Sequence, residues 1–178
     1  MEPKQGPARD LEQTVRLAAE SLGQWSDDDA SRPPGPGKWS PKEVLGHLVD
    51  SASNNHGRFV RASLQDEMVF PGYAQDDWVS SQRYGDAPWS ELLELWKGFN
   101  LHLARFMANV PEDVRTRPIT RHNLQEIAWE TPPQGEPVTL GFFMADYVNH
   151  LKHHLRQIDV GLADEPAPQL SLGKRKSR

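Results

Sequence analysis

Three histidines are the residues of this sequence best suited to chemistry: His47, His150 and His154. His150 and His154 stand four residues apart in the segment NHLKHHLRQID, and on an α-helix this spacing places two imidazoles about one turn apart on the same side. Two imidazoles in this arrangement can bind a single metal ion. If the fold also brings His47 to that ion, three nitrogen ligands leave coordination positions open, which is typical of a catalytic rather than a structural metal site.

The composition restricts the metal chemistry further. The chain contains no cysteine, so disulfides and thiolate sites are excluded and every protein ligand is nitrogen or oxygen. We therefore expect a divalent metal ion, with zinc or nickel first among the metals that imidazole binds, while iron and copper stay open. The paired Glu-x-x-His motifs of a di-iron carboxylate bundle are missing.

Helices are expected to position these histidines, because apolar residues recur at helical spacing in four long segments. The segments are residues 10–22, 40–65, 89–110 and 139–161. Gly23 can end the first segment and Gly161 the fourth. No segment alternates convincingly as a strand does, so the sequence predicts an all-α fold, a four-helix bundle.

Several of these helices begin at residues that can cap them. Ser40, Pro41 and Glu43 form the pattern of a capping box with proline in the first helical position. Asp86 and Thr139 are expected to cap the third and fourth long helices.

The connections are longer than a minimal bundle needs. Residues 24–38 and 66–74 are expected to be loops and residues 111–138 to be irregular. Short helical pieces are predicted near residues 76–84 and 124–129. Long loops between rigid helices are where a substrate pocket can form.

Length and charge limit the organisation and the partners. A chain of 178 residues suits one domain, which we place at residues 1–162, followed by a flexible basic tail at residues 163–178. The net charge of −5 and the pI near 5.8 argue against a nucleic-acid partner. The polar N-terminus lacks a signal-peptide core, and no segment approaches the roughly 18 apolar residues of a membrane span. We expect a cytoplasmic protein.

Polar residues flank the apolar stripe of the second long helix. At about 100° per residue, with Val44 at zero, four of them fall between about −20° and −80°, and Asp50 lies near −120°. The four are His47, Ser51, Asn54 and Arg58. On the last helix His150 and His154 likewise border the stripe, whereas His153 points away toward solvent or a loop. Two such flanks facing each other would enclose a polar cavity.

Each of these residues also has a purely structural interpretation. A lone histidine beside a core stripe is usually a hydrogen-bonded, half-buried side chain, and HxxxH is a short and common pattern. Arg58 could form an interhelix salt bridge, and Asp50 could be a solvated carboxylate. The other histidines show no comparable arrangement and are expected at the surface or in loops: His56, His102 and His122.

The chain resembles the DinB-like superfamily of four-helix-bundle proteins in three segments, KWSPKEVLGHLVDSASNNHGRF, FPGYAQDDW and LGFFMADYVNHLKHHLRQI. Within it the chain looks most like the bacillithiol-transferase (DinB/YfiT-like) type, also described as metal-dependent hydrolases. The likeness covers roughly residues 10–160. It implies His47, His150 and His154 as metal ligands, and it extends to the polar residues of the second long helix, Asp50, Ser51, Asn54 and Arg58.

The predicted function is a metal-dependent enzyme, a thiol S-transferase or a hydrolase, that activates a thiol or water for reaction with a small-molecule substrate. A low-molecular-weight thiol would come from outside, since the chain has no cysteine. Asp50 and Arg58 are the candidate catalytic residues, and Ser51, Asn54 and Arg58 are the candidates for substrate binding. The alternative is a non-catalytic bundle, a binding or stress-response protein with structural or adventitious metal. Exposed apolar faces could support a homodimer.

Overall fold

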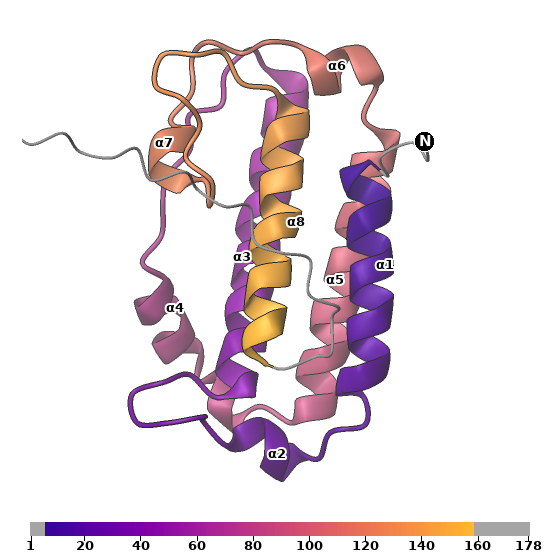
Figure 1. Ribbon diagram of the computed structural model, residues 1–178, viewed down its shortest axis with the longest axis vertical. Coiled ribbons are helices and arrows are strands. Elements are labelled where there is room, and N and C mark those ends of the chain that lie inside the picture. The colour runs from indigo at the N-terminus through magenta and orange to yellow at the C-terminus, as the bar shows by residue number, and fades with distance from the viewer. Residues whose placement is uncertain (1–5, 159–178) are drawn as a thin grey trace, which may run out of the picture.

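The computed structural model describes residues 6–158, which form a helical bundle (Figure 1). Its four long helices confirm the predicted all-α fold: α1 (Pro7–Leu22), α3 (Pro41–Leu64), α5 (Trp89–Asn109) and α8 (Leu140–Gln157). Within the described residues there is no strand, and β-pairing is limited to the isolated bridges Met68–His122 and Ile119–Val138. The predicted domain end at residue 162, the tail and Gly161 lie outside these residues.

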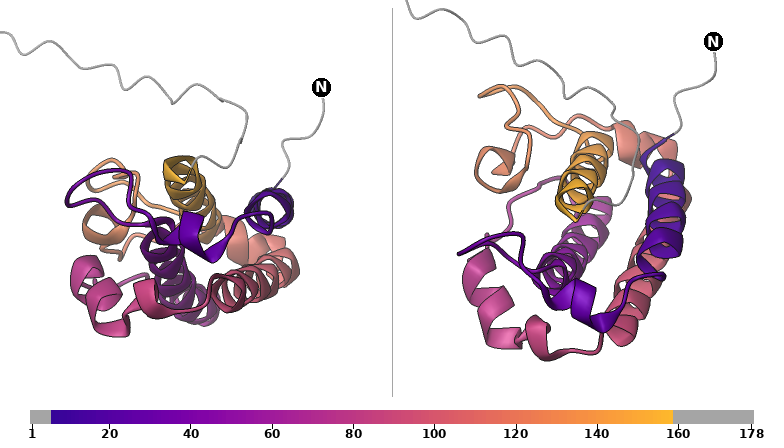
Figure 2. Two further views of the ribbon diagram at one scale, coloured as in Figure 1. Left: turned by 90° about the horizontal axis from the view of Figure 1, so that it is seen from below. Right: turned by 60° about the horizontal axis from the view of Figure 1, so that its bottom comes forward.

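The order of the helices around the bundle differs from their order in the chain. Helices α1 and α3 each pack against both α5 and α8, so α1 and α3 stand at diagonal corners (Figure 2). The indole of Trp89, at the start of α5, donates to the carbonyl of Leu22 at the end of α1, which makes these two helices antiparallel. Helix α8 runs antiparallel to α3 and beside it (Figure 1). Two segments about a hundred residues apart in sequence therefore share one interface.

Five short helical elements occupy the connections. They are α2 (Asp27–Ser31), α4 (Gln75–Gln82), the 3-10 helix η1 (Tyr84–Asp86), α6 (Glu112–Thr116) and α7 (Leu124–Ile127). Helices α4 and α7 agree with the predicted helical pieces, whereas η1 begins where the first of those pieces was expected to end and was not predicted. Helices α2 and α6 were not predicted, because five residues are too few to show an apolar period.

The predicted caps are confirmed in two of three cases. Ser40 and Glu43 form the reciprocal capping box of α3, and the hydroxyl of Thr139 accepts from the backbone N–H of Phe142 in α8. The prediction for Asp86 is wrong, because Pro88 occupies the N-cap position of α5.

A residue distant in sequence instead accepts a hydrogen bond from the first backbone N–H group of α5. The carboxylate of Asp27 accepts from the backbone N–H of Trp89 at 2.8 Å and also pairs with Lys42 at 2.8 Å. This contact fastens α2 to the first turns of α3 and α5. Sequence patterns contain no signal for it, since capping motifs are local.

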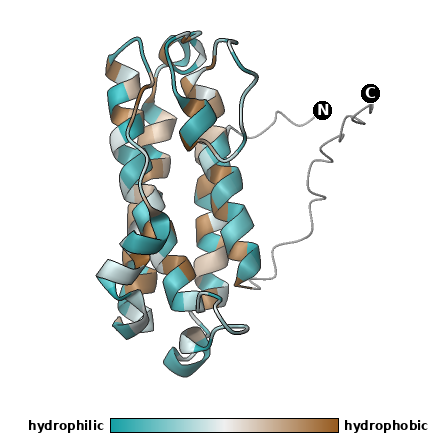
Figure 3. Cartoon of the chain, turned by 90° about the vertical axis from the view of Figure 1, so that its left-hand side faces the viewer, coloured by the Kyte–Doolittle hydropathy of each residue, from teal (hydrophilic) through white to brown (hydrophobic). Residues whose placement is uncertain are grey.

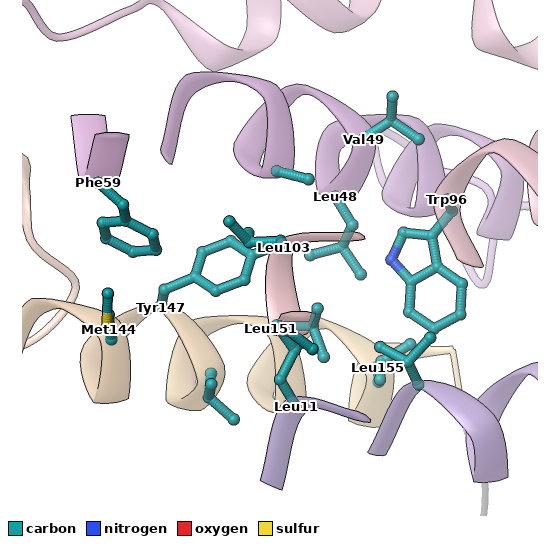
Figure 4. Close-up of a cluster of buried hydrophobic side chains, with 14 of the residues drawn as sticks. Leu11, Leu48, Val49, Phe59, Trp96, Leu103, Met144, Tyr147, Leu151 and Leu155 are labelled. Carbon is teal, nitrogen blue, oxygen red and sulfur yellow. The ribbon is translucent and has the colours of Figure 1, made fainter. Parts of the chain in front are cut away.

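The core lies between the four long helices. Aromatic and aliphatic side chains of all four meet there, including Phe59 of α3, Trp96 of α5 and Tyr147 of α8 (Figure 4). The helices that face the viewer in Figure 3 have both hydrophobic and hydrophilic residues along their length, as expected of amphipathic helices. Among residues 6–158, none of the helices has the length and apolar character needed to cross a bilayer.

Gly46 allows a close contact next to His47. The ring of Tyr84, from η1, lies directly against the Cα of Gly46, and a Cβ at this position would overlap with Cγ and Cδ2 of that ring. The tyrosine hydroxyl in turn donates to the buried carboxylate of Asp50 at 2.7 Å. The absence of a side chain at residue 46 therefore lets η1 pack on α3.

We expect Gly46→Ala to lower the free energy of unfolding by about 1–3 kcal/mol, because overpacking a buried contact outweighs the helix propensity gained. Gly98→Ala is the matched control. Gly98 is an exposed glycine inside α5 with open space around its Cα, so this change should raise stability by about 0.5–1 kcal/mol. Urea unfolding of both variants measures the difference, and stabilisation by both substitutions would contradict the packing argument.

Candidate metal centre

The interface of α3 with α8 brings together the three histidines singled out in the sequence. His47 comes from α3 and His150 and His154 from α8, and one ligand nitrogen of each lies within 4.8 Å of the others. The ring centroids are 4.5 Å apart for His150 and His154 and 4.6 Å apart for His47 and His154. Within the described residues this is the one cluster of three or more such side chains able to hold a metal ion.

The donor set fits a divalent ion bound by imidazole. Nε2 of His47 lies 3.4 Å from Nε2 of His150, and Zn–N bonds of about 2.0–2.1 Å at tetrahedral angles would place two nitrogens about 3.3–3.4 Å apart. The surroundings also favour the neutral, ligating form. Burial lowers the pKa of His47 to about 4 and that of His150 to about 3, and it lowers the pKa of His154 as well.

Two of the histidines have a polar partner at Nδ1 that orients the ring. Nδ1 of His154 lies 2.9 Å from Oε1 of Gln157, an acceptor, so Nδ1 carries the proton and Nε2 is left free to ligate. Nδ1 of His150 lies 3.5 Å from the hydroxyl oxygen of Ser51. Nδ1 of His47 is buried and has no partner among the described residues. The contacts at Nδ1 thus hold the α8 histidines more firmly than His47 is held.

A cavity of about 240 Å³ opens from His47 and His150 along α3. Three further residues of α3 line it at successive turns, Ser51, Asn55 and Arg58, and Asp146 and Tyr147 line it from α8. The segment before α4 supplies Gly72 and Tyr73, and the segment around α7 supplies Glu126, Ile127, Ala128 and Trp129. The long connections thus form the outer wall of a pocket next to the histidines, as the sequence predicted for loops of this length.

Two predicted polar residues lie elsewhere. The side chain of Asn54 donates to the backbone carbonyl of Asp50 and does not line the cavity, whereas Asn55 does. Asn55 falls near 20° on the scale used above, inside the sector attributed to the apolar stripe, so sequence reasoning missed it. Asp50 is buried and accepts from Tyr84 and Gln82. It is therefore not the solvated carboxylate that the sequence left open.

Aromatic side chains border the histidines on both sides. The ring of Trp39 lies 5.3 Å from that of His47, and the ring of Trp129 lies 5.5 Å from that of His150. His153 turns away from the cluster, as predicted, and its ring lies 4.5 Å from Trp129. The apolar periodicity of the sequence does not predict that Trp39 or Trp129 lies beside the histidines, because both residues are outside the long helices.

A second, larger hollow adjoins the same cluster. It has a volume of about 460 Å³ and is lined by Trp25, Trp39, Gln157 and residues of the connection between α1 and α3. Its lining is mainly apolar, and it contains none of the three histidines. Of these two hollows, the smaller one combines two of the histidines with several polar side chains, so it is the candidate ligand site.

Buried neutral histidines make the stability of the metal-free protein depend on pH. Because the pKa values of His47 and His150 lie below the ordinary 6.5, the unfolded chain binds protons between pH 6.5 and 4 that the folded protein does not. Stability therefore falls as the pH falls through this interval. Asp146 acts in the opposite direction, because burial raises the pKa of its carboxyl group to about 6.

We expect the metal-free protein to lose about 2 kcal/mol more stability between pH 7.5 and pH 5.0 than its His47→Gln variant loses. Urea unfolding at the two pH values measures this difference. Asp146→Asn removes the opposing proton uptake, so that variant should lose more stability than the wild type over the same interval. Equal losses for the wild type and His47→Gln would contradict the assignment of a buried neutral imidazole.

Comparison with known proteins gives the chain a family. The family model of the DinB superfamily matches residues 10–158, and no curated protein matches the chain. One similar solved structure is YfiT from Bacillus subtilis, described as a probable metal-dependent hydrolase with an unusual four-helix bundle topology. It is 20% identical with a TM-score of 0.69, over 86% of this chain and 82% of that one.

A second similar structure is the mycothiol-dependent maleylpyruvate isomerase. It is 12% identical with a TM-score of 0.62, over 85% of this chain and 59% of that one. At these identities both structures establish a shared fold, and the predicted resemblance is confirmed. Since the family model spans nearly all of the described residues, the chain belongs to the DinB superfamily.

Proposed function

We propose that this protein is a metal-dependent enzyme that binds a divalent ion through His47, His150 and His154 and acts on a small molecule in the adjoining cavity. The observation that supports this most strongly is the convergence of the three imidazoles, with ligand nitrogens within 4.8 Å of one another, at the wall of a polar cavity. Two further observations agree with a ligand here: the lowered pKa values of His47 and His150 favour the neutral, ligating form, and Nδ1 of His47 is buried without a hydrogen-bond partner among the described residues.

The residues around the ion have distinct tasks in this proposal. Three neutral imidazoles leave the charge of the ion uncompensated, and such an ion supplies Lewis-acid chemistry that ionises a bound water or thiol near neutral pH. Gln157 holds the proton of His154 on Nδ1. Ser51 supports His150, and the indole of Trp129 forms part of the cavity wall beside the same histidine.

A thiol S-transferase and a hydrolase are the two forms of this activity. One similar structure is described as a probable metal-dependent hydrolase, and the other is an isomerase that depends on mycothiol, a thiol. The chain has no cysteine of its own, so a thiol would enter as a low-molecular-weight cosubstrate. Zinc and nickel remain the preferred metals for three imidazoles.

The roles of the other predicted residues differ in their support. Arg58 and Ser51 line the cavity and remain candidates for substrate binding. The catalytic role of Asp50 and the binding role of Asn54 stay predictions, since neither side chain lines the cavity. Three further properties also stay predictions: the cytoplasmic location, the homodimer, and the absence of nucleic-acid and membrane partners.

Metal content tests the ligand set. We expect His150→Ala and His154→Ala to lower the affinity for zinc or nickel by at least about 100-fold, because each removes one of three protein ligands. His102→Ala is the matched control, since His102 is an exposed histidine of α5 whose ring contacts His56, outside the cluster. Equilibrium dialysis with elemental analysis measures the affinity. Unchanged metal binding in both ligand variants would exclude this site.

The activity itself is tested by a screen of small thiols with an electrophilic probe, and of ester substrates without thiol, each with and without metal. Metal-dependent turnover that is lost in His150→Ala and kept in His102→Ala supports the enzyme. The non-catalytic alternative predicts no adduct and no hydrolysis under any condition, together with ligand binding that does not change when the metal is removed.

A further inference from the structure

Arg58 is a buried cation without an acidic partner. Its side chain is only 5% exposed, and none of the ion pairs among residues 6–158 includes it. Its Nη2 donates to the backbone carbonyl of Pro71 at 2.7 Å, and its Nη1 lies 3.4 Å from the amide oxygen of Asn55. Both partners are neutral. The guanidinium therefore keeps its full positive charge in a poorly hydrated place, which is costly unless an anion binds there.

The acidic residues of the cavity do not neutralise this charge. Asp146 lines the same cavity, but its two oxygens accept from the backbone N–H groups of Trp129 and Glu130, at 3.0 and 2.6 Å. Glu126 is exposed at the cavity mouth. Neither carboxylate lies within 4.0 Å of the guanidinium, since no such ion pair occurs among the described residues. Arg58 is thus the one lysine or arginine among the residues that line the cavity, and no carboxylate pairs with it there.

A continuous row of polar groups joins Arg58 to the metal ligands. The amide of Asn55 donates to the hydroxyl oxygen of Ser51 at 3.3 Å, and that oxygen lies 3.5 Å from Nδ1 of His150. Residues 47, 51, 55 and 58 all line the cavity from successive turns of α3. Eleven residues of helix correspond to about 16 Å along the axis, and helical side chains lean toward the N-terminus, so Arg58 leans toward His47.

From this arrangement we infer that the cavity binds a small carboxylate: the planar anion pairs with Arg58, and the rest of the molecule extends along α3 to the three histidines. A guanidinium binds carboxylates through parallel hydrogen bonds, which accounts for arginine rather than lysine at this position. The cavity of about 240 Å³ is at the small end of ligand sites, which excludes large polymers. This inference rests on the proposed function for the identity of the opposite end of the site.

Carboxylate binding is tested first in the metal-free protein, with hexanoate as the probe and its neutral analogue hexanamide as the reference. We expect wild-type protein to bind hexanoate at least about tenfold more tightly than hexanamide. Arg61→Gln is the matched control, because Arg61 is exposed one turn further along α3 and the substitution changes the charge equally. The preference should persist in Arg61→Gln and disappear in Arg58→Gln, as measured by ligand-observed NMR titration.

The two ends of the site are tested together in the nickel-loaded protein. 6-Mercaptohexanoate should bind at least about tenfold more tightly than 6-mercaptohexan-1-ol in the wild type and in Arg61→Gln, and about equally in Arg58→Gln. Arg58→Lys, which keeps the charge but not the planar fork, should give an intermediate ratio. Thermal unfolding of each variant establishes that it is folded. If Arg58→Gln does not fold, the inference is tested by comparing the ratio of the two affinities in the wild type with the ratio in Arg58→Lys.

The outcomes separate this inference from the proposed function. Thiols that bind the metal without any preference for the carboxylate in the wild type would overturn the inference and leave the metal-dependent function standing. An Arg58-dependent preference for hexanoate, together with no metal binding at the histidines, would support the inference and remove the function. An unchanged preference in Arg58→Gln would show that the anion binds elsewhere and would overturn the inference.

Discussion

The antiparallel packing of α3 on α8 is the constraint on which the rest of the site depends. Helix α3 contributes His47 and helix α8 contributes His150 and His154, and only this interface places all three imidazoles around one point. Phe59 and Phe143 pack edge to face, with centroids 5.2 Å apart, between the same two helices. Because close-packed cores resist displacement, such contacts fix the relative position of the helices and of the histidines on them.

Burial gives the cluster its chemical character. Burial lowers the pKa of all three imidazoles, to about 4 for His47 and about 3 for His150. They are then neutral lone-pair donors at physiological pH, while Arg58 remains charged at the other end of the row along α3. The cavity therefore has two unlike poles, a set of donors for a cation and one cation for an anion. A ligand complementary to both poles has a defined orientation.

Sequence periodicity predicted those features that depend on single helices. The four long helices, the capping box at Ser40 and the placement of the α8 histidines beside the core stripe follow from local spacing. The choice between Asn54 and Asn55 did not, because the edge of an apolar stripe is not sharp at one residue. The roles of Asp27, Trp39 and Trp129 also lay beyond periodicity, since each depends on a loop that meets a helix distant in sequence. The burial of Asp50 against Tyr84 depends likewise on where η1 folds back.

X-ray absorption spectroscopy on the metal-loaded protein, together with a crystal structure of the same complex, can establish whether the three histidines bind one ion. We expect one ion with three imidazole nitrogens at about 2.0–2.1 Å, belonging to His47, His150 and His154, and remaining positions filled by solvent or ligand. An ion held elsewhere on the chain, or one bound by the α8 histidines with His47 turned away, would contradict this expectation.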